Sequence, residues 1–272
     1  MQATRIAIHG ASGRMGRALL RESLAREDSV VVAALVGAHS ASLGAPLARL
    51  LGITEAPDLA CESTLDPRAR AQVLVDFSLA SAFDEALALA QSRGLAFVTG
   101  TTGLSPAQHA AIARAGTRIP VLWSANFSLG VAVLARLVDD AARLLAGWEC
   151  EISEAHHRAK RDAPSGTALA LGRGVASARG VAFDDVAKLA RSGIATDGRA
   201  PSEIGFAVTR AGDIVGEHAV LFASDGERVE LSHRATDRAI FARGALTAAG
   251  WLAKRPPGLY TLADMLADRA MA

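Results

Sequence analysis

The stretch that decides the fold lies near the start of the chain and runs Ile6-Ala-Ile-His-Gly10-Ala-Ser-Gly13-Arg-Met-Gly16. Three glycines at this spacing follow an apolar run and precede a helical pattern, as in the fingerprint of dinucleotide-binding folds. Glycines let the backbone approach a pyrophosphate, and the start of a helix offers it unpaired N–H groups. The stretch predicts a nucleotide site, with a purely structural tight turn as the alternative.

Short apolar runs alternate with helical patterns through the first half of the chain. We expect strands at 5–9, 30–36, 73–77, 96–99 and 121–124, and helices at 15–26, 80–93 and 105–115. Such alternation requires crossover connections and produces a parallel sheet whose carboxyl edge binds ligands. The fold class is therefore α/β, with a Rossmann-type dinucleotide-binding domain.

The pattern changes after Asn126. We expect helices at 128–145 and 167–178, strands at 149–155, 203–210, 217–222 and 228–233, and closing helices at 241–254 and 262–266. Asp225-Gly226 between two apolar runs is a hairpin signal. These elements predict an α+β domain with a mixed, partly antiparallel sheet.

Composition excludes several classes of protein. The 272 residues include 29 Lys+Arg against 28 Asp+Glu, a net charge of +1, so nucleic acid and anionic membranes are not expected as partners. The longest apolar stretch, 30–38, is far shorter than the roughly 20 residues of a membrane helix. The pattern of a signal peptide is not expected at the amino terminus. The two cysteines, Cys61 and Cys150, have a spacing that suits neither a disulfide framework nor a metal site, so we expect a cytoplasmic location.

The end of the second strand leaves the choice of cofactor open. The fingerprint predicts a carboxylate there for the adenosine ribose, but the strand ends in Val36-Gly37, which weakens the case for strict NAD preference. No arginine follows directly, and the possible phosphate contacts are Arg14, Arg17, His39 and Ser40. The sequence leans towards NADPH over NADH.

Two later loops follow predicted strands at the same sheet edge. They are Gly100-Thr101-Thr102-Gly103 and Ser124-Ala125-Asn126-Phe127. Each alone resembles an ordinary turn, but their shared placement predicts contacts with a nicotinamide.

The segment from Glu154 to Ala168 has the highest concentration of candidate catalytic side chains, with two His, two Arg and one Lys in residues 156–161. It ends in a Pro-Ser-Gly-Thr turn that opens a helix. The N–H groups of Gly166 and Thr167, and the hydroxyls of Ser165 and Thr167, are expected to face a carboxylate or phosphate. The alternative is a helix N-cap preceded by a solvated run of charges.

Proton transfer suits this segment better than metal binding. Adjacent strand residues point to opposite faces, so His156 and His157 are not expected to share a metal ion, and no metal site is predicted. Histidine titrates near neutral pH, and Lys160 offers a proton or a fixed positive charge. The charged stretch 210–218 suits an exposed loop equally well.

Together these motifs resemble the bacterial dihydrodipicolinate reductase family of the diaminopimelate route to lysine, over nearly the whole chain. The matching stretches are Gly10-Ala-Ser-Gly-Arg-Met-Gly16, 100–103, 125–127, Glu154-Ala-His-His-Arg158 with Lys160, Asp162-Ala-Pro-Ser-Gly-Thr-Ala168, and 210–218. The resemblance implies NAD(P)H-dependent reduction of 4-hydroxy-tetrahydrodipicolinate, a small cyclic dicarboxylate, to tetrahydrodipicolinate. It departs from many relatives at Val36-Gly37 and Ser124.

The resemblance also implies a domain organisation and a role for each candidate site residue. Residues 1–126 and 238–272 would form the dinucleotide-binding domain, and 127–237 the domain that binds substrate and forms a homotetramer. His156 and Lys160 would be proton donors, and His157, Gly166 and Thr167 would contact substrate, together with Ser165 from the helix-start argument. The residues predicted to contact the cofactor are Gly10, Ala11, Ser12, Gly13, Arg14, Met15, Gly100, Thr101, Thr102, Ser124, Ala125, Asn126 and Phe127.

Two rival functions fit the sequence less well. A non-catalytic nucleotide-sensing protein of the same fold would have lost the proton donors or the anion site, yet both stand in this sequence. A dehydrogenase acting through a cysteine thiolate needs a cysteine at a loop or helix start, whereas Cys150 lies in an apolar strand pattern.

Overall fold

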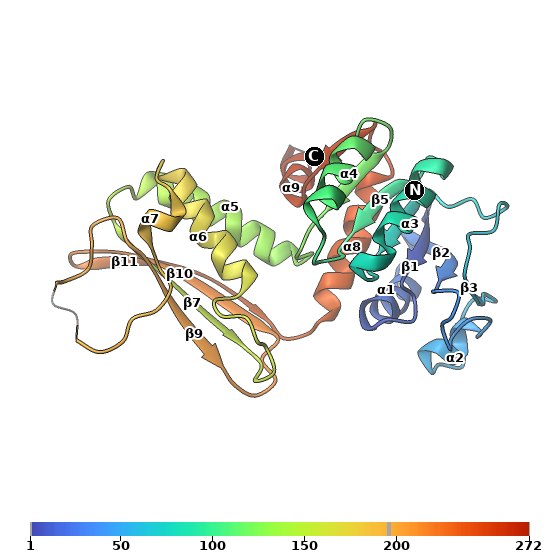
Figure 1. Ribbon diagram of the computed structural model, residues 1–272, viewed down its shortest axis with the longest axis horizontal. Helices are drawn as coiled ribbons and strands as arrows, with labels where there is room; N and C mark the ends of the chain where they lie inside the picture. The colour runs from blue at the N-terminus through green and yellow to red at the C-terminus, as the bar shows by residue number, and fades with distance from the viewer. Residues whose placement is uncertain (1, 195–196, 272) are drawn as a thin grey trace. The chain divides into compact units, whose positions relative to one another are not determined.

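The computed structural model describes residues 2–194 and 197–271 (Figure 1). The chain divides into two compact units: unit 1, Met1–Leu129 with Ala239–Ala272, and unit 2, Gly130–Arg238. Within the described residues, no helix has the length and apolar character needed to span a membrane.

Unit 1 is built on a seven-stranded sheet in the order β12-β6-β5-β4-β1-β2-β3. Its strands are β1 (Thr4–His9), β2 (Ser29–Leu35), β3 (Cys61–Glu62), β4 (Val73–Asp76), β5 (Ala96–Thr99), β6 (Pro120–Trp123) and β12 (Gly258–Tyr260). All neighbours pair in parallel. The strand order reverses between β1 and β4, which is where ligands bind in open α/β sheets. The predicted Rossmann-type sheet is confirmed.

Helices cover both faces of this sheet (Figure 1). The helices in contact with its strands are α1 (Arg14–Leu24), α3 (Phe83–Arg93, after a short 3-10 turn at Ala80–Ala82), α4 (Pro106–Ala115) and α8 (Ala239–Leu252). Two further helices, α2 (Leu47–Leu51) and α9 (Leu262–Met271), pack on α1 and α8 respectively. On the α3 and α4 side the core contains Phe83 and Phe97, both fully buried with ring centroids 6.0 Å apart. Burying each ring contributes about 2 to 3 kcal/mol. Packing of this kind fixes the sheet that carries the loops at its edge.

Unit 2 has a five-stranded mixed sheet in the order β11-β10-β7-β9-β8. The elements are α5 (Leu129–Leu144), β7 (Glu149–His156), α6 (Gly166–Ala178), α7 (Phe183–Val186), β8 (Ala187–Lys188), β9 (Ile204–Arg210), β10 (Gly216–Ser224) and β11 (Glu227–Ala235). β7 runs antiparallel to β10 and parallel to β9. The mixed sheet and the hairpin at Asp225-Gly226 are confirmed, since Ser224 pairs with Glu227.

Burial along β7 alternates with the two-residue period of a strand. Cys150, Ile152, Glu154 and His156 are buried, while the residues between them are more exposed. The first two pack in the apolar core under α5 and α6. The same periodicity therefore places a carboxylate and an imidazole inside the protein, next to one another on one face.

Several short elements were not predicted: α2, β3, α7, β8 and β12. Each has two to five residues, too few to show a helical or strand period. A strand such as β12 is defined by its pairing with a distant strand, here β6, rather than by its own sequence.

Candidate active site

The glycine loop joins β1 to α1, and two of its positions, Gly10 and Gly16, have no room for a Cβ. Gly10 has φ +77°, and a Cβ there would lie 2.8 Å from the carbonyl oxygen of Phe77. A Cβ at Gly16 would lie 2.2 Å from the carbonyl oxygen of Gly10. Gly13 is the N-cap of α1, and among the described residues no side chain caps the helix, so its first N–H groups are available to a ligand. This loop fits the pyrophosphate of a dinucleotide.

A buried carboxylate organises the neighbouring loop. Asp76, at the end of β4, accepts hydrogen bonds from the hydroxyls of Thr99 and Thr101, both at 2.8 Å, and from Nδ1 of His9 at 2.7 Å. Burial alone would raise the pKa of the Asp76 carboxyl, but these hydrogen bonds and the charge of His9 outweigh it and lower the pKa. The carboxylate thereby fixes the start of loop 100–103.

The loop after β6 is tied to its neighbours in the same unit. The indole Nε1 of Trp123 donates to the carbonyl of Thr101 at 3.1 Å. The hydroxyl of Ser124 donates to the carbonyl of Asn126 at 2.7 Å, and Phe127 is buried with its ring 5.4 Å from that of Phe77. The two loops and the glycine loop thus gather at the carboxyl edge of one sheet.

In unit 2, Glu154 is the centre of a buried polar cluster. Its carboxylate accepts two hydrogen bonds from Arg210, both at 2.7 Å, one from Nδ1 of His156 at 2.6 Å and one from the backbone N–H of Ser165 at 2.9 Å. Strand pairing sets this up, because His156 lies opposite Arg210 on β9 and Glu154 opposite His218 on β10. A fully buried charge is tolerated here because it is so fully paired.

The cluster holds Glu154 ionised and His156 in one orientation. Burial would raise the pKa of Glu154, yet hydrogen bonds from Arg210, His156 and Ser165 lower it. Burial lowers the pKa of His156, and the partly opposing effect of Glu154 does not cancel this. Because the ionised carboxylate must accept a proton from Nδ1, Nε2 is the ring atom left for chemistry.

Nε2 of His156 has a glycine beside it. A Cβ at Gly216, the first residue of β10, would lie 3.1 Å from that nitrogen. Glycine at this position therefore keeps a Cβ out of close contact with Nε2.

The basic residues that follow β7 lie close to this cluster. The ammonium of Lys160 is 2.9 Å from Asp162, and its side chain is 21% exposed. Its charge contributes to the lowered pKa of His156, so the two groups interact. His157 is half-buried just beyond the strand, and its carbonyl accepts from the N–H of Lys160 at 3.1 Å.

The start of α6 differs in one respect from the expectation. Ser165 is buried, and its hydroxyl accepts from the N–H of Ala168 and lies 3.2 Å from Nε2 of His218, so it does not face a ligand. The hydroxyl is short and N-caps the helix, which turns it inwards. Gly166 is exposed and Thr167 half-buried at the helix start, where backbone N–H groups suit an anion.

Sequence reasoning did not single out Glu154, Arg210 and His218 as site residues, nor His9 and Asp76. The alternation of apolar and polar residues along 149–153 is a signal for Glu154, because its continuation places an acid on the face of Cys150 and Ile152. The stretch 210–218, whose sequence also suits an exposed loop, supplies both Arg210 and His218 to the cluster.

Comparison with known proteins gives matches along nearly the whole chain. Residues 4–127 match the family model for the dihydrodipicolinate reductase N-terminus, and residues 130–266 match that for its C-terminus. A 4-hydroxy-tetrahydrodipicolinate reductase of Stenotrophomonas maltophilia (strain K279a) is 47% identical over 96% of this chain and 97% of its own. Another, of Xanthomonas campestris pv. campestris (strain B100), is 48% identical over the same shares.

Solved structures agree in fold. A dipicolinate-bound dihydrodipicolinate reductase from Paenisporosarcina sp. TG-14 superposes with a TM-score of 0.75 at 22% identity, covering 95% of this chain and 97% of that one. A myo-inositol dehydrogenase from Corynebacterium glutamicum ATCC 13032 shares the fold more distantly, with a TM-score of 0.57, 14% identity and coverage of 94% and 90%. With both halves matched by family models and close relatives spanning nearly its full length, the chain belongs to the dihydrodipicolinate reductase family of oxidoreductases.

Proposed function

We propose that the protein catalyses the NAD(P)H-dependent reduction of 4-hydroxy-tetrahydrodipicolinate to tetrahydrodipicolinate in the diaminopimelate route to lysine. The observation that carries this proposal is the buried Glu154–His156 pair beside Lys160, in a chain nearly half identical to reductases of that name. Substrate and NAD(P)H, with one proton, give tetrahydrodipicolinate, NAD(P)⁺ and water, so the protein must supply a proton and bind two carboxylates.

Unit 1 is the proposed cofactor-binding domain. The glycine loop, Gly10 to Met15, would hold the pyrophosphate, and the loops 100–102 and 124–127 would position the nicotinamide. When bound, the cofactor supplies the hydride. Because no carboxylate follows β2 at Val36 and Gly37 to hold the ribose hydroxyls, we propose NADPH as the preferred form and NADH as the second one.

Unit 2 is the proposed substrate-binding domain. Lys160 is a cation beside the buried pair, and His156, with Nδ1 held by Glu154, would carry the transferred proton on Nε2. His157 would contact the substrate, and the N–H groups of Gly166 and Thr167 would bind one of its carboxylates. Ser165 would act by holding the start of α6 and the ring of His218. Cationic and N–H groups suit a small dianionic substrate.

We propose a homotetramer formed through unit 2, on the strength of family membership. A cytoplasmic location is favoured by the two buried, unpaired cysteines, Cys61 and Cys150.

The direct test is loss of absorbance of NADPH, and separately of NADH, when the protein meets substrate generated in place from pyruvate and aspartate semialdehyde by the preceding synthase. Oxidation with either cofactor, with tetrahydrodipicolinate as the product, supports the proposal. Folded protein that binds nucleotide and oxidises neither cofactor would point instead to a nucleotide-sensing role.

A further inference from the structure

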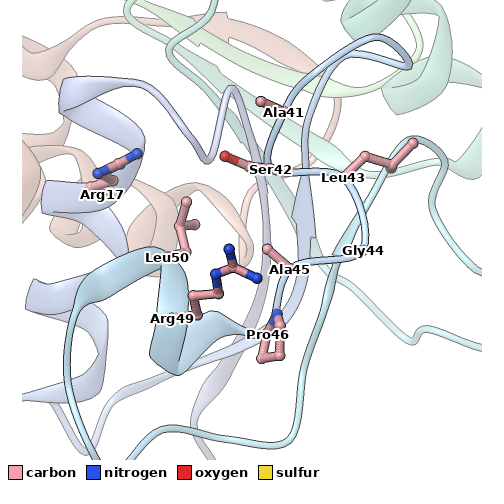
Figure 2. A pocket seen from close by; sticks show the side chains of 9 residues that line it. All are labelled: Arg17, Ala41, Ser42, Leu43, Gly44, Ala45, Pro46, Arg49 and Leu50. Carbon is pink, nitrogen blue, oxygen red and sulfur yellow. The ribbon is translucent and has the colours of Figure 1, made fainter.

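A basic pocket lies beside the end of β2 in unit 1. It has a volume of about 290 Å³ and is formed by α1, by the loop that follows β2 and by α2 (Figure 2). In dinucleotide-binding folds the end of the second strand is where the adenosine ribose lies. The pocket therefore adjoins the proposed site of the cofactor's adenosine half, and the inference drawn from it rests on the proposed function.

Two guanidinium groups line this pocket, one from Arg17 on α1 and one from Arg49 on α2. Figure 2 shows both side chains directed to the space between the helices and the loop around Ser42. The described residues that line it include no carboxylate. In the part of the chain that the structure describes, several other arginines are ion-paired, including Arg26, Arg191 and Arg210, but no ion pair involves these two.

Arg17 links the pocket to the glycine loop. Its Nε donates to the carbonyl oxygen of Ser12 at 3.0 Å, which leaves its two terminal nitrogens directed elsewhere. Ser12 lies within the stretch proposed to hold the pyrophosphate. A single arginine thus spans the distance from the pyrophosphate loop to the pocket.

The short helix α2, which carries Arg49, is held in place by buried side chains and hydrogen bonds. Leu47, Leu50 and Leu51 are buried, and the carbonyl of Leu51 accepts from Nη2 of Arg21 on α1 at 2.7 Å. The preceding loop is tied to β3, where Gly44 and Cys61 share a backbone hydrogen bond of 2.8 Å. The backbone under Arg49 is therefore fixed before any ligand arrives, which lowers the entropy cost of binding.

We propose that Arg49, together with Arg17, binds the 2′-phosphate of NADPH, so that α2 supplies the cation that the loop after β2 lacks. A phosphate monoester is a dianion with three acceptor oxygens, and a guanidinium can donate two parallel hydrogen bonds to it. NADH carries a neutral hydroxyl at the same position and gains nothing from either arginine. Arg49 is then a specificity-determining residue, distant from the proton-transfer cluster.

The test compares two small probes that differ only by this phosphate: adenosine 2′,5′-bisphosphate and adenosine 5′-monophosphate. Their binding to the full-length protein is measured by titration calorimetry, with Arg49→Gln as the variant and Arg49→Lys as the conservative one. Arg118→Gln is the matched control, because Arg118 is an exposed arginine of unit 1 just before the start of β6, at the opposite edge of the sheet. Arg17 is left intact because it also contacts the glycine loop.

We expect wild type to bind the bisphosphate at least about tenfold more tightly than the monophosphate, and Arg49→Gln to lose about tenfold in affinity for the bisphosphate alone. Arg49→Lys should keep part of the preference and Arg118→Gln all of it. Equal affinities of wild type for the two probes, an unaltered preference in Arg49→Gln, or an equal loss in Arg118→Gln would each overturn the inference while leaving the reductase proposal standing. Failure of wild type to bind either probe would overturn this inference, whereas the reductase proposal is decided separately by oxidation of NADPH or NADH.

Discussion

Nδ1 of His156 lies 2.6 Å from Oε2 of Glu154, and both residues are buried on the same face of β7. The pair resembles the acid–histidine arrangements in which a carboxylate fixes the tautomer and direction of an imidazole that transfers protons. Arg210 completes it by neutralising the carboxylate through two hydrogen bonds. We therefore regard Glu154 as a positioning residue that acts through His156.

Replacing Glu154 with Gln removes the charge but keeps the shape. The amide nitrogen would face donors from Arg210, His156 or Ser165, so we expect unit 2 to lose about 3 to 5 kcal/mol of stability and turnover to fall. A purely structural role would lower stability without moving the pH dependence of kcat, whereas a positioning role shifts the pH profile. Glu149→Gln, an exposed acid on the same strand, should alter neither stability nor pH profile.

The proton-donor assignment predicts the effect of two single substitutions. His156→Ala and Lys160→Ala should each lower kcat by about 10²- to 10⁴-fold, because each removes a group able to give a proton to the substrate. Affinity for NADPH should be retained, since neither residue lies on the glycine loop. Unchanged turnover in both variants would remove the assignment.

The crowding around Gly16 predicts loss of nucleotide binding. In Gly16→Ala the added methyl would press on the backbone of Gly10, distorting the loop, lowering stability by about 1 to 3 kcal/mol and weakening NADPH binding by more than about tenfold. Gly250→Ala is a suitable control, because a Cβ there meets nothing closer than 3.7 Å and lies within α8. Fluorescence titration with NADPH checks both, and equal affinities in the two variants would contradict this account of the loop.

Burial of His218 predicts acid sensitivity of unit 2. Burial, and to a smaller extent the charge of His156, lower the pKa of His218 to about 4 from its usual 6.5. Between pH 6.5 and 4 the His218 side chain therefore binds a proton in the unfolded chain but not in the folded one. The contribution of His218 to the free energy of unfolding is fully present above pH 6.5. It declines by about 3 kcal/mol as the pH falls to 4. Urea midpoints measured over this range should fall less steeply in His218→Asn than in wild type, and parallel curves would exclude His218 as the source.

The sequence was informative wherever local pattern decides structure. The strand, glycine turn and helix at 4–24 follow from residue spacing, as does the hairpin in which Ser224 pairs with Glu227. Long periodic helices such as α5 were predicted to within one residue at each end.

Local sequence patterns do not predict which side chains meet across neighbouring strands, because those contacts depend on the register of the sheet. Arg210 and Glu154 meet because β9 pairs with β7 in one register out of several that the apolar pattern allows. His9 and Asp76 meet for the same reason, as opposite residues of β1 and β4. Ser165 was expected to face a ligand because an N-cap hydroxyl looks the same in sequence whether it turns outwards or, as here, inwards towards His218.

The central claim is that hydride passes from the cofactor to the substrate on this protein. It is tested most directly with NADPH deuterated at the transferring position of the nicotinamide, with tetrahydrodipicolinate analysed by mass spectrometry. The account predicts a product that carries the deuterium with wild type and very slow product formation with the His156→Ala/Lys160→Ala double variant, in samples that bind NADPH equally well. Product formed without deuterium, or no product from folded wild type that binds NADPH, would contradict it.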